Sequence, residues 1–115
     1  MSGNRIDKVN SLLKHEISKI IQKEINFSND VLVTLTYVKT TANLIEARVF
    51  ISVLPEERLN EVLEILKRNV FMIQQKINKK LNMRPIPKIM FMEDKTESEA
   101  DKIEKIIKEL KKDEN

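Results

Sequence analysis

The first part of the chain is amphipathic. Apolar residues between Ile6 and Ile25 recur at steps of three and four positions, with polar residues between them. The buried face of an α-helix has this spacing. The pattern therefore predicts a helix over about Arg5–Ile25, with Asn4 as its N-cap.

Two strands are predicted next. Apolar and polar residues alternate over Val31–Tyr37 and again over Ala47–Val53, and many of them are β-branched. The polar break Thr40–Asn43 is too short for a crossover helix, so we expect the strands to be antiparallel. In this alternation Tyr37 has the phase of Leu35, which places its ring on the inner face of the sheet.

A long helix and a third strand follow. Pro55 suits a first helical position, and helical spacing of apolar residues then continues to Leu81. The prolines in Arg84-Pro85-Ile86-Pro87 end the helix. Lys88–Glu93 alternates again and predicts a short strand in which Phe91 faces inward.

The pattern after the third strand predicts a final helix. Thr96 and Glu99 form a capping box. The apolar stripe after it consists of Ala100, Ile103, Ile107 and Leu110.

The predicted order is helix, strand, strand, long helix, strand, helix. Because each helix has one apolar stripe, the helices should cover one face of a three-stranded sheet, giving a two-layer α+β sandwich. We expect a single domain over residues 1–112 and a frayed end at 113–115, since 115 residues suit one core.

Charge is unevenly distributed. The formal net charge is only +3, yet residues 65–92 contain seven basic residues and no acidic one. Such asymmetry is typical of a protein that binds a polyanion, although a solvated helix face also accounts for many charge runs.

Helical geometry indicates where the basic side chains of this stretch point. Arg68, Lys76 and Lys79 fall away from the apolar stripe, whereas Lys80 lies near its edge and must extend its ammonium outward along its aliphatic stem. Arg84 and Lys88 continue the charge beyond the helix. We predict a basic ridge made of these six residues.

Aromatic residues do not accompany the ridge in the number that stacking-based single-strand binders use. Tyr37 and Phe91 are expected on the inner face of the sheet, which makes the sheet an unlikely stacking platform. Phe71 is out of phase with its helix. It is either exposed and able to stack on a base, or tucked inside by a bend near Asn69–Phe71, and we favour the bend.

Residue counts disfavour most enzyme chemistry. There is no Cys, the one His is His15 on a polar helix face, and the one Gly is Gly3 near the terminus. Thiolate metal sites, nucleophile constellations and glycine-rich phosphate loops therefore lack residues, and we expect no catalysis, metal or cofactor. No apolar run approaches the roughly 20 residues of a membrane span, so we expect a cytoplasmic protein.

The sequence resembles the bacterial ribosome-binding factor A family over about residues 5–110. The segments that carry the likeness are Arg5–Val9, Glu16-Ile17, Val33–Val38, Asn43-Leu44, Ala47–Ser52, Met83–Phe91 and Asp94.

The resemblance implies a KH-like (type II) fold and a protein that binds 16S rRNA in the free 30S subunit. It further implies support of late subunit maturation and 16S rRNA processing, with importance in the cold, and no small-molecule substrate. It also implies that the long helix is two helices joined at a kink, which the family builds around Ala-x-Gly. This chain has Asn69, Val70 and Phe71 there.

Together these inferences predict a monomeric RNA-binding protein. The residues expected to contact phosphates are the six of the ridge, Arg68, Lys76, Lys79, Lys80, Arg84 and Lys88, with Arg5 and Lys8 as helpers. A protein–protein module that docks an acidic partner, and a DNA-binding protein, are the alternatives.

Overall fold

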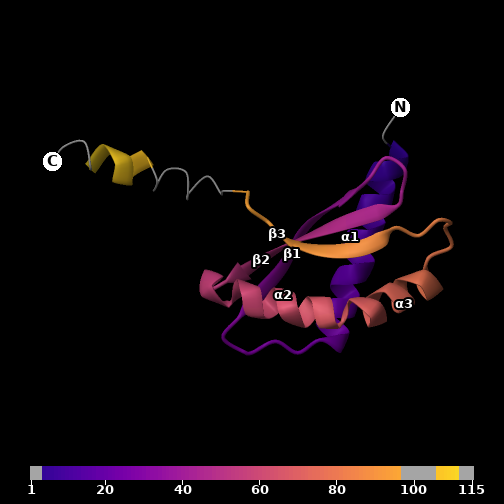
Figure 1. Cartoon of the computed structure of the whole chain (residues 1–115), viewed down its shortest axis with the longest axis horizontal. Coiled ribbons are helices and arrows are strands. Elements are labelled where there is room, and N and C mark those ends of the chain that lie inside the picture. Colours follow the sequence, from indigo (N-terminus) through magenta and orange to yellow (C-terminus); the bar gives the residue numbers. More distant parts are fainter. Residues whose placement is uncertain (1–3, 97–105, 112–115) are drawn as a thin grey trace.

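The computed structural model describes residues 4–96 and 106–111 of the chain (Figure 1). In chain order the elements are α1 (Asn4–Glu24), β1 (Leu32–Thr40), β2 (Glu46–Leu54), the 3-10 turn η1 (Glu56–Arg58), α2 (Leu59–Arg68), α3 (Val70–Lys80) and β3 (Lys88–Glu93).

A helical segment at 106–111 covers part of the predicted final helix, and its Ile107 and Leu110 are exposed. Thr96 lies in the loop after β3. Glu99, Ala100 and Ile103 of that prediction lie outside the described residues.

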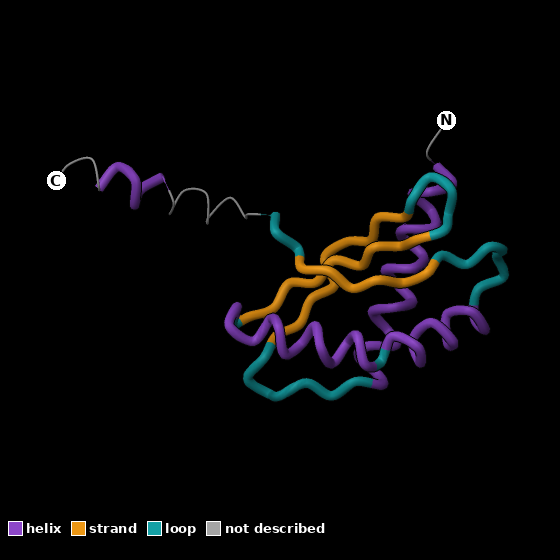
Figure 2. The backbone as a smooth tube through the Cα atoms, viewed as in Figure 1, coloured by secondary structure: helices purple, strands orange, loops and turns teal. Residues whose placement is uncertain are grey.

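The three strands form one sheet in the order β1-β2-β3. β1 and β2 are antiparallel, as predicted, whereas β2 and β3 are parallel, with α2 and α3 forming the crossover between them (Figure 2). α1 packs on β1, α2 on β2 and β3, and α3 on β3 and α1. The predicted two-layer α+β sandwich is confirmed.

The core lies between the helices and one face of the sheet. Leu13 and Ile17 of α1, Ile51 of β2 and Ile77 of α3 are fully buried there. Along β2 the even-numbered residues are exposed or half-buried, whereas the odd-numbered ones from Ala47 to Val53 are buried. The opposite face of the sheet is thus left without a covering layer in the described part of the chain.

A β-bulge at Thr36 changes the phase of β1. Leu35 pairs with Ile51, but the next pair in register is Tyr37 with Phe50, so Thr36 has no partner in the ladder. The Thr36 hydroxyl instead donates a hydrogen bond to the Phe50 carbonyl at 3.1 Å. Because one extra residue reverses the alternation, Tyr37 points to the outer face and is 40% exposed. The inward placement predicted for Tyr37 is therefore wrong, whereas Phe91 is buried as predicted.

The turn between β1 and β2 is fixed by side chains. Asn43 Oδ1 accepts hydrogen bonds from the Thr41 hydroxyl at 2.6 Å and from the Ile45 N–H at 3.1 Å. Leu44 has a positive φ of 61°, a strained conformation for a residue with a Cβ, and its side chain is buried. Burial of Leu44 and the bonds of Asn43 hold the strained backbone in place.

The helical pattern that begins at Pro55 is not one helix. Pro55 precedes the short turn η1, and α2 begins at Leu59. α2 and α3 meet at Asn69, whose φ of −101° and ψ of 3° depart from helical values. Its side-chain Nδ2 donates to the Ile65 carbonyl at 2.7 Å.

The described residues include no helix with the length and apolarity that a membrane span requires.

Candidate nucleic-acid interface

A groove between α1 and α3 gathers basic side chains from both helices. Its lining includes five lysines together with Ile20 and Glu24. The lysines are Lys19, Lys23, Lys76, Lys79 and Lys80. We call this surface the lysine groove.

A buried carboxylate fixes the two helices at one end of the groove. The Glu16 side chain is only 10% exposed, and its Oε2 lies 2.6 Å from the Lys80 ammonium, while its Oε1 lies 3.9 Å from Lys19. The hydrogen bond from Lys80 lowers the pKa of Glu16 despite its burial, and the same bond raises the pKa of Lys80. Lys80 thus joins α3 to α1, in addition to contributing charge.

A second ion pair links the helices farther along. Lys76 Nζ lies 3.3 Å from Glu24 Oε1 at the end of α1. Within residues 4–96 and 106–111, neither Lys23 nor Lys79 has an acidic group within ion-pair distance. These two ammonium groups are available to an anionic ligand without breaking an existing contact.

The remaining residues of the predicted ridge are more scattered. Arg68, at the end of α2, lies with Lys67 and Glu64 beside a separate shallow hollow. Arg84 is exposed in the loop before β3 and donates to the neighbouring Met83 carbonyl at 3.0 Å. Lys88 is exposed at the start of β3 and, since Ile89 after it faces the core, points to the outer face of the sheet.

The predicted helpers Arg5 and Lys8 are exposed in the first turns of α1. Lys8 precedes Glu16 by eight residues, which is roughly 12 Å along a helix. They therefore lie beyond the lysine groove on α1, and the structure groups only Lys76, Lys79 and Lys80 of the predicted set with each other.

Lys19 and Lys23 are the groove residues that the sequence prediction did not include. They stand four positions apart on α1, so they share one helix face. This spacing was a usable signal, but the charge count singled out residues 65–92 and did not show which part of α1 would lie beside α3.

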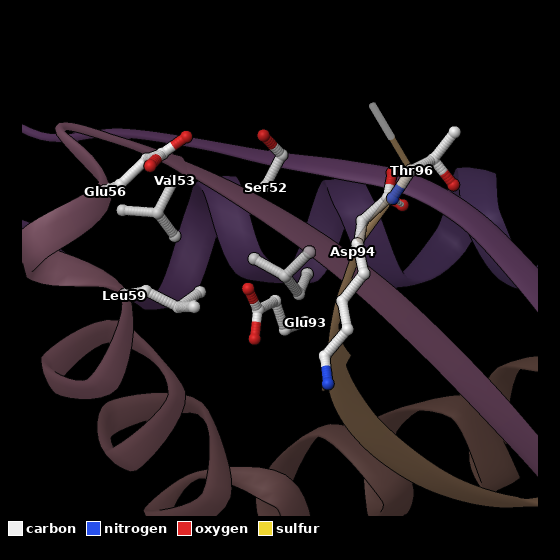
Figure 3. A pocket seen from close by; sticks show the side chains of 9 residues that line it. Ser52, Val53, Glu56, Leu59, Glu93, Asp94 and Thr96 are labelled. Atoms are coloured by element: carbon white, nitrogen blue, oxygen red, sulfur yellow. Dashed lines mark hydrogen bonds between the residues drawn. The ribbon is translucent and has the colours of Figure 1, made fainter. Parts of the chain in front are cut away.

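A hollow of opposite charge lies where β2 and β3 end near η1 (Figure 3). Glu56, Glu93 and Asp94 line it together with Lys95. The Thr96 N–H donates to the Asp94 carboxylate at 2.8 Å and lowers the pKa of Asp94, which keeps that group ionised. Acids in this number repel phosphate. In the described part of the chain no cluster of His, Cys, Asp or Glu side chains could hold a metal ion.

A family model and the similar proteins of known family agree on one family for this chain. The family model described as ribosome-binding factor A matches residues 5–107. A ribosome-binding factor A from Chlorobaculum tepidum is 41% identical over 110 residues, which cover 93% of this chain and 91% of that relative. The chain belongs to the ribosome-binding factor A family.

Solved structures of similar proteins share the fold. The solution NMR structure of a Thermotoga maritima protein, described as a candidate ribosome-binding factor A, has a TM-score of 0.68 and 26% identity, covering 85% of this chain and 95% of that one. A Thermus thermophilus ribosome-binding factor A, fitted as a homology model into a cryo-EM map of a 30S complex, has a TM-score of 0.59 and 20% identity. It covers 72% of this chain and 88% of that one.

The junction of α2 and α3 at Asn69 lies where the resemblance to the ribosome-binding factor A family implies a kink. The resemblance places the family's glycine at Phe71. Phe71 lies inside α3, and among the described residues Leu44, not Phe71, is the one other than glycine with a positive φ, so the conformational freedom of glycine is not required at this position.

Phe71 follows this junction, and the prediction that a bend tucks its ring inside is wrong. It is 72% exposed, because Phe71 lies on the side of α3 opposite the buried Ile73 and Ile77. Its ring lines a shallow hollow with Gln75, Lys76 and Lys79, next to the lysine groove.

Proposed function

We propose that this member of the ribosome-binding factor A family binds 16S rRNA of the free 30S subunit as a monomer and supports late maturation of that subunit, including 16S rRNA processing, with particular importance in the cold. The observation that carries the proposal is the lysine groove. Its five lysines outnumber the two acids, Glu16 and Glu24, that pair with them.

The chemistry of the groove suits the sugar–phosphate backbone. Lysine ammonium groups contact phosphates as point charges and read no sequence, so such contacts set position and depend on salt. The likeness to a Thermus thermophilus protein placed in a 30S complex supports the small subunit as the target.

The exposed cations outside the groove extend the proposal. Arg68, Arg84, Lys88, Arg5 and Lys8 would each contact phosphates at a distance from the groove, which requires a large, folded RNA surface. A ribosomal subunit offers such a surface, whereas a short single strand would reach only part of this set.

The test is co-sedimentation of purified 30S subunits with the Lys23→Glu/Lys79→Glu double variant. Neither lysine holds an ion-pair partner in the described chain, so the fold should persist. Affinity for 30S subunits should fall by about tenfold for each lost phosphate contact. The slope of log affinity against log salt concentration should become shallower by about two, which is about one for each lost contact. The Lys14→Glu/Lys95→Glu variant, exposed outside the groove, makes the same change in net charge and should bind normally.

Equal binding by both double variants would overturn the assignment of the groove. Capture of a protein from cells that persists after nuclease treatment, with no 30S binding, would favour a module for an acidic partner. Tighter binding to duplex DNA than to 30S subunits would favour the DNA-binding alternative.

A further inference from the structure

The outer face of the sheet carries large apolar side chains in contact with solvent. Tyr37, Met90 and Met92 are each 37–40% exposed, and Leu32 and Leu54 are more exposed still. The helices α1, α2 and α3 pack on the other face. Contiguous exposed apolar groups of this kind mark a binding surface.

Two aromatic rings form the centre of this face. Tyr37 of β1 and Phe50 of β2 are partners in register, and their rings stack with centroids 4.2 Å apart and planes within 12° of parallel. Met92 of β3 is the register partner of Phe50 on the other side. The three side chains form one row across the sheet, which we call the aromatic row.

The row ends in an open ring face. Phe50 covers one face of the Tyr37 ring. β1 is an edge strand, so no other strand among residues 4–96 and 106–111 lies against the other face, and Tyr37 is 40% exposed. A planar ring that stacks there would extend the column by one member. Nucleobases are the planar groups that stack on protein aromatics irrespective of sequence.

Cations flank the aromatic row. Lys39 lies two residues beyond Tyr37 on the same face of β1, roughly 7 Å away. Arg48 is its register partner, and Lys88 lies on the same face of β3. Glu46 lies 3.8 Å from Arg48, and the Asp94 carboxylate interacts with the Thr36 hydroxyl beside the ring pair, so the three cations outnumber these acids. The positive balance fits a polyanion and disfavours a cationic or uncharged partner.

The bulge at Thr36 shows why the ring is exposed. Without the extra residue, regular alternation would turn Tyr37 into the core. Bulges re-aim side chains in this way at binding sites. The Thr36 hydroxyl bonded to the Phe50 carbonyl holds the bulge beside the ring pair.

We infer that the outer face of the sheet is a second nucleic-acid site, which takes an unpaired base of single-stranded RNA on Tyr37 while Lys39, Arg48 and Lys88 contact the adjoining phosphates. This site lies on the sheet layer, whereas the lysine groove lies on the helical layer. The two sites share no residue, so the inference does not depend on the lysine groove; Lys88, one of the outlying cations of the proposed function, belongs to this second site.

The composition supplies a direct probe of this site. Tyr37 is the only tyrosine and the chain has no tryptophan, so intrinsic fluorescence reports Tyr37 alone. A single-stranded oligouridine of about ten nucleotides should quench this emission, after correction for absorption, and shift the methyl NMR signals of Met90 and Met92. An abasic strand of equal length, which keeps the phosphates but has no bases, should do neither.

Affinity measured with a labelled oligouridine tests the stacking contact. Tyr37→Ala should weaken binding roughly 5- to 150-fold, whereas Tyr37→Phe retains a ring and should restore it. Thr34→Ala, on the same face two residues before the bulge, is the matched control and should bind normally. In the Lys23→Glu/Lys79→Glu groove variant, saturating oligouridine should still quench the Tyr37 emission fully. This result distinguishes a failure of the sheet site from a failure of the lysine groove.

Three outcomes would overturn the inference. They are equal quenching by the abasic strand, equal affinity of Tyr37→Ala and the unmodified protein, and quenching by an acidic peptide such as oligoglutamate in the absence of any response to oligouridine. The last result would assign the face to a protein partner.

Discussion

The Glu16 carboxylate on α1 lies 2.6 Å from the Lys80 ammonium at the end of α3, and its side chain is nearly buried. Burial alone would favour the neutral acid, yet the hydrogen bond from Lys80 lowers the pKa of Glu16 below its ordinary value of 4.5. The ion pair thus ties the position of α3 to the ionised state of one carboxylate.

The pH dependence of stability should follow Glu16. A carboxylate whose pKa is lower in the folded state contributes stability that is present above pH 4.5 and lost as the pH falls through the folded pKa. Thermal melts followed by circular dichroism should show that Glu16→Gln has a lower Tm than the unmodified protein at pH 7. As the pH falls below 4.5, the Tm of Glu16→Gln should decrease less than the Tm of the unmodified protein. Glu57→Gln, an exposed acid, is the control, and parallel curves for all three proteins would contradict the prediction.

Asn69→Ala should destabilise the junction of α2 and α3. The substitution removes the bond from Nδ2 to the Ile65 carbonyl, which is worth about 0.5–1.5 kcal/mol, although alanine is the better helix former. Urea denaturation measures the difference. An alanine variant as stable as the unmodified protein would show that backbone bonds alone maintain the break.

Phe71→Ala should separate binding from stability. A side chain that is 72% exposed contributes little to the core, so the free energy of unfolding should change by less than about 0.5 kcal/mol. If the ring stacks on a base beside Lys76 and Lys79, affinity for 30S subunits should fall by about 1–3 kcal/mol. Leu12→Ala, an exposed apolar residue of α1, serves as control, and unchanged affinity of Phe71→Ala would leave the ring without a role in binding.

Thr36→Val should weaken the bulge. Valine keeps the shape of threonine but cannot donate to the Phe50 carbonyl, so we expect a loss of about 1 kcal/mol in unfolding free energy. The hydroxyl of Thr36 also contributes to the lowered pKa of Asp94. Chemical denaturation should therefore show the loss, and Thr34→Val, on a regular stretch of β1, should not show it.

Most of the fold could be predicted from periodicity. The α1 prediction of Arg5–Ile25 differs from the observed Asn4–Glu24 by one residue at each end, and the third strand, Lys88–Glu93, has the predicted bounds. Alternation could not reveal the bulge, since one unpaired residue depends on the register with a partner strand. For this reason Tyr37 and Phe50 could not be predicted to stack on the outer face.

The site was only partly predictable for a related reason. Counting charges located Lys76, Lys79 and Lys80, because these residues are neighbours on one helix. Lys19 and Lys23 join them only through the packing of α1 against α3, which no local pattern specifies. Glu16 carried a misleading signal, since a charged side chain suggests a polar surface, whereas the structure buries it against Lys80.

The parallel pairing of β2 with β3 sets an order of assembly. The β1–β2 hairpin closes over a short turn held by Asn43, whereas β3 reaches β2 only after the crossover through α2 and α3 has formed. We therefore expect β3 to join the sheet last during folding and to open first. Its amides, including the Lys88 N–H bonded to the Ile45 carbonyl at 2.8 Å, should exchange with deuterium sooner than those shared by β1 and β2.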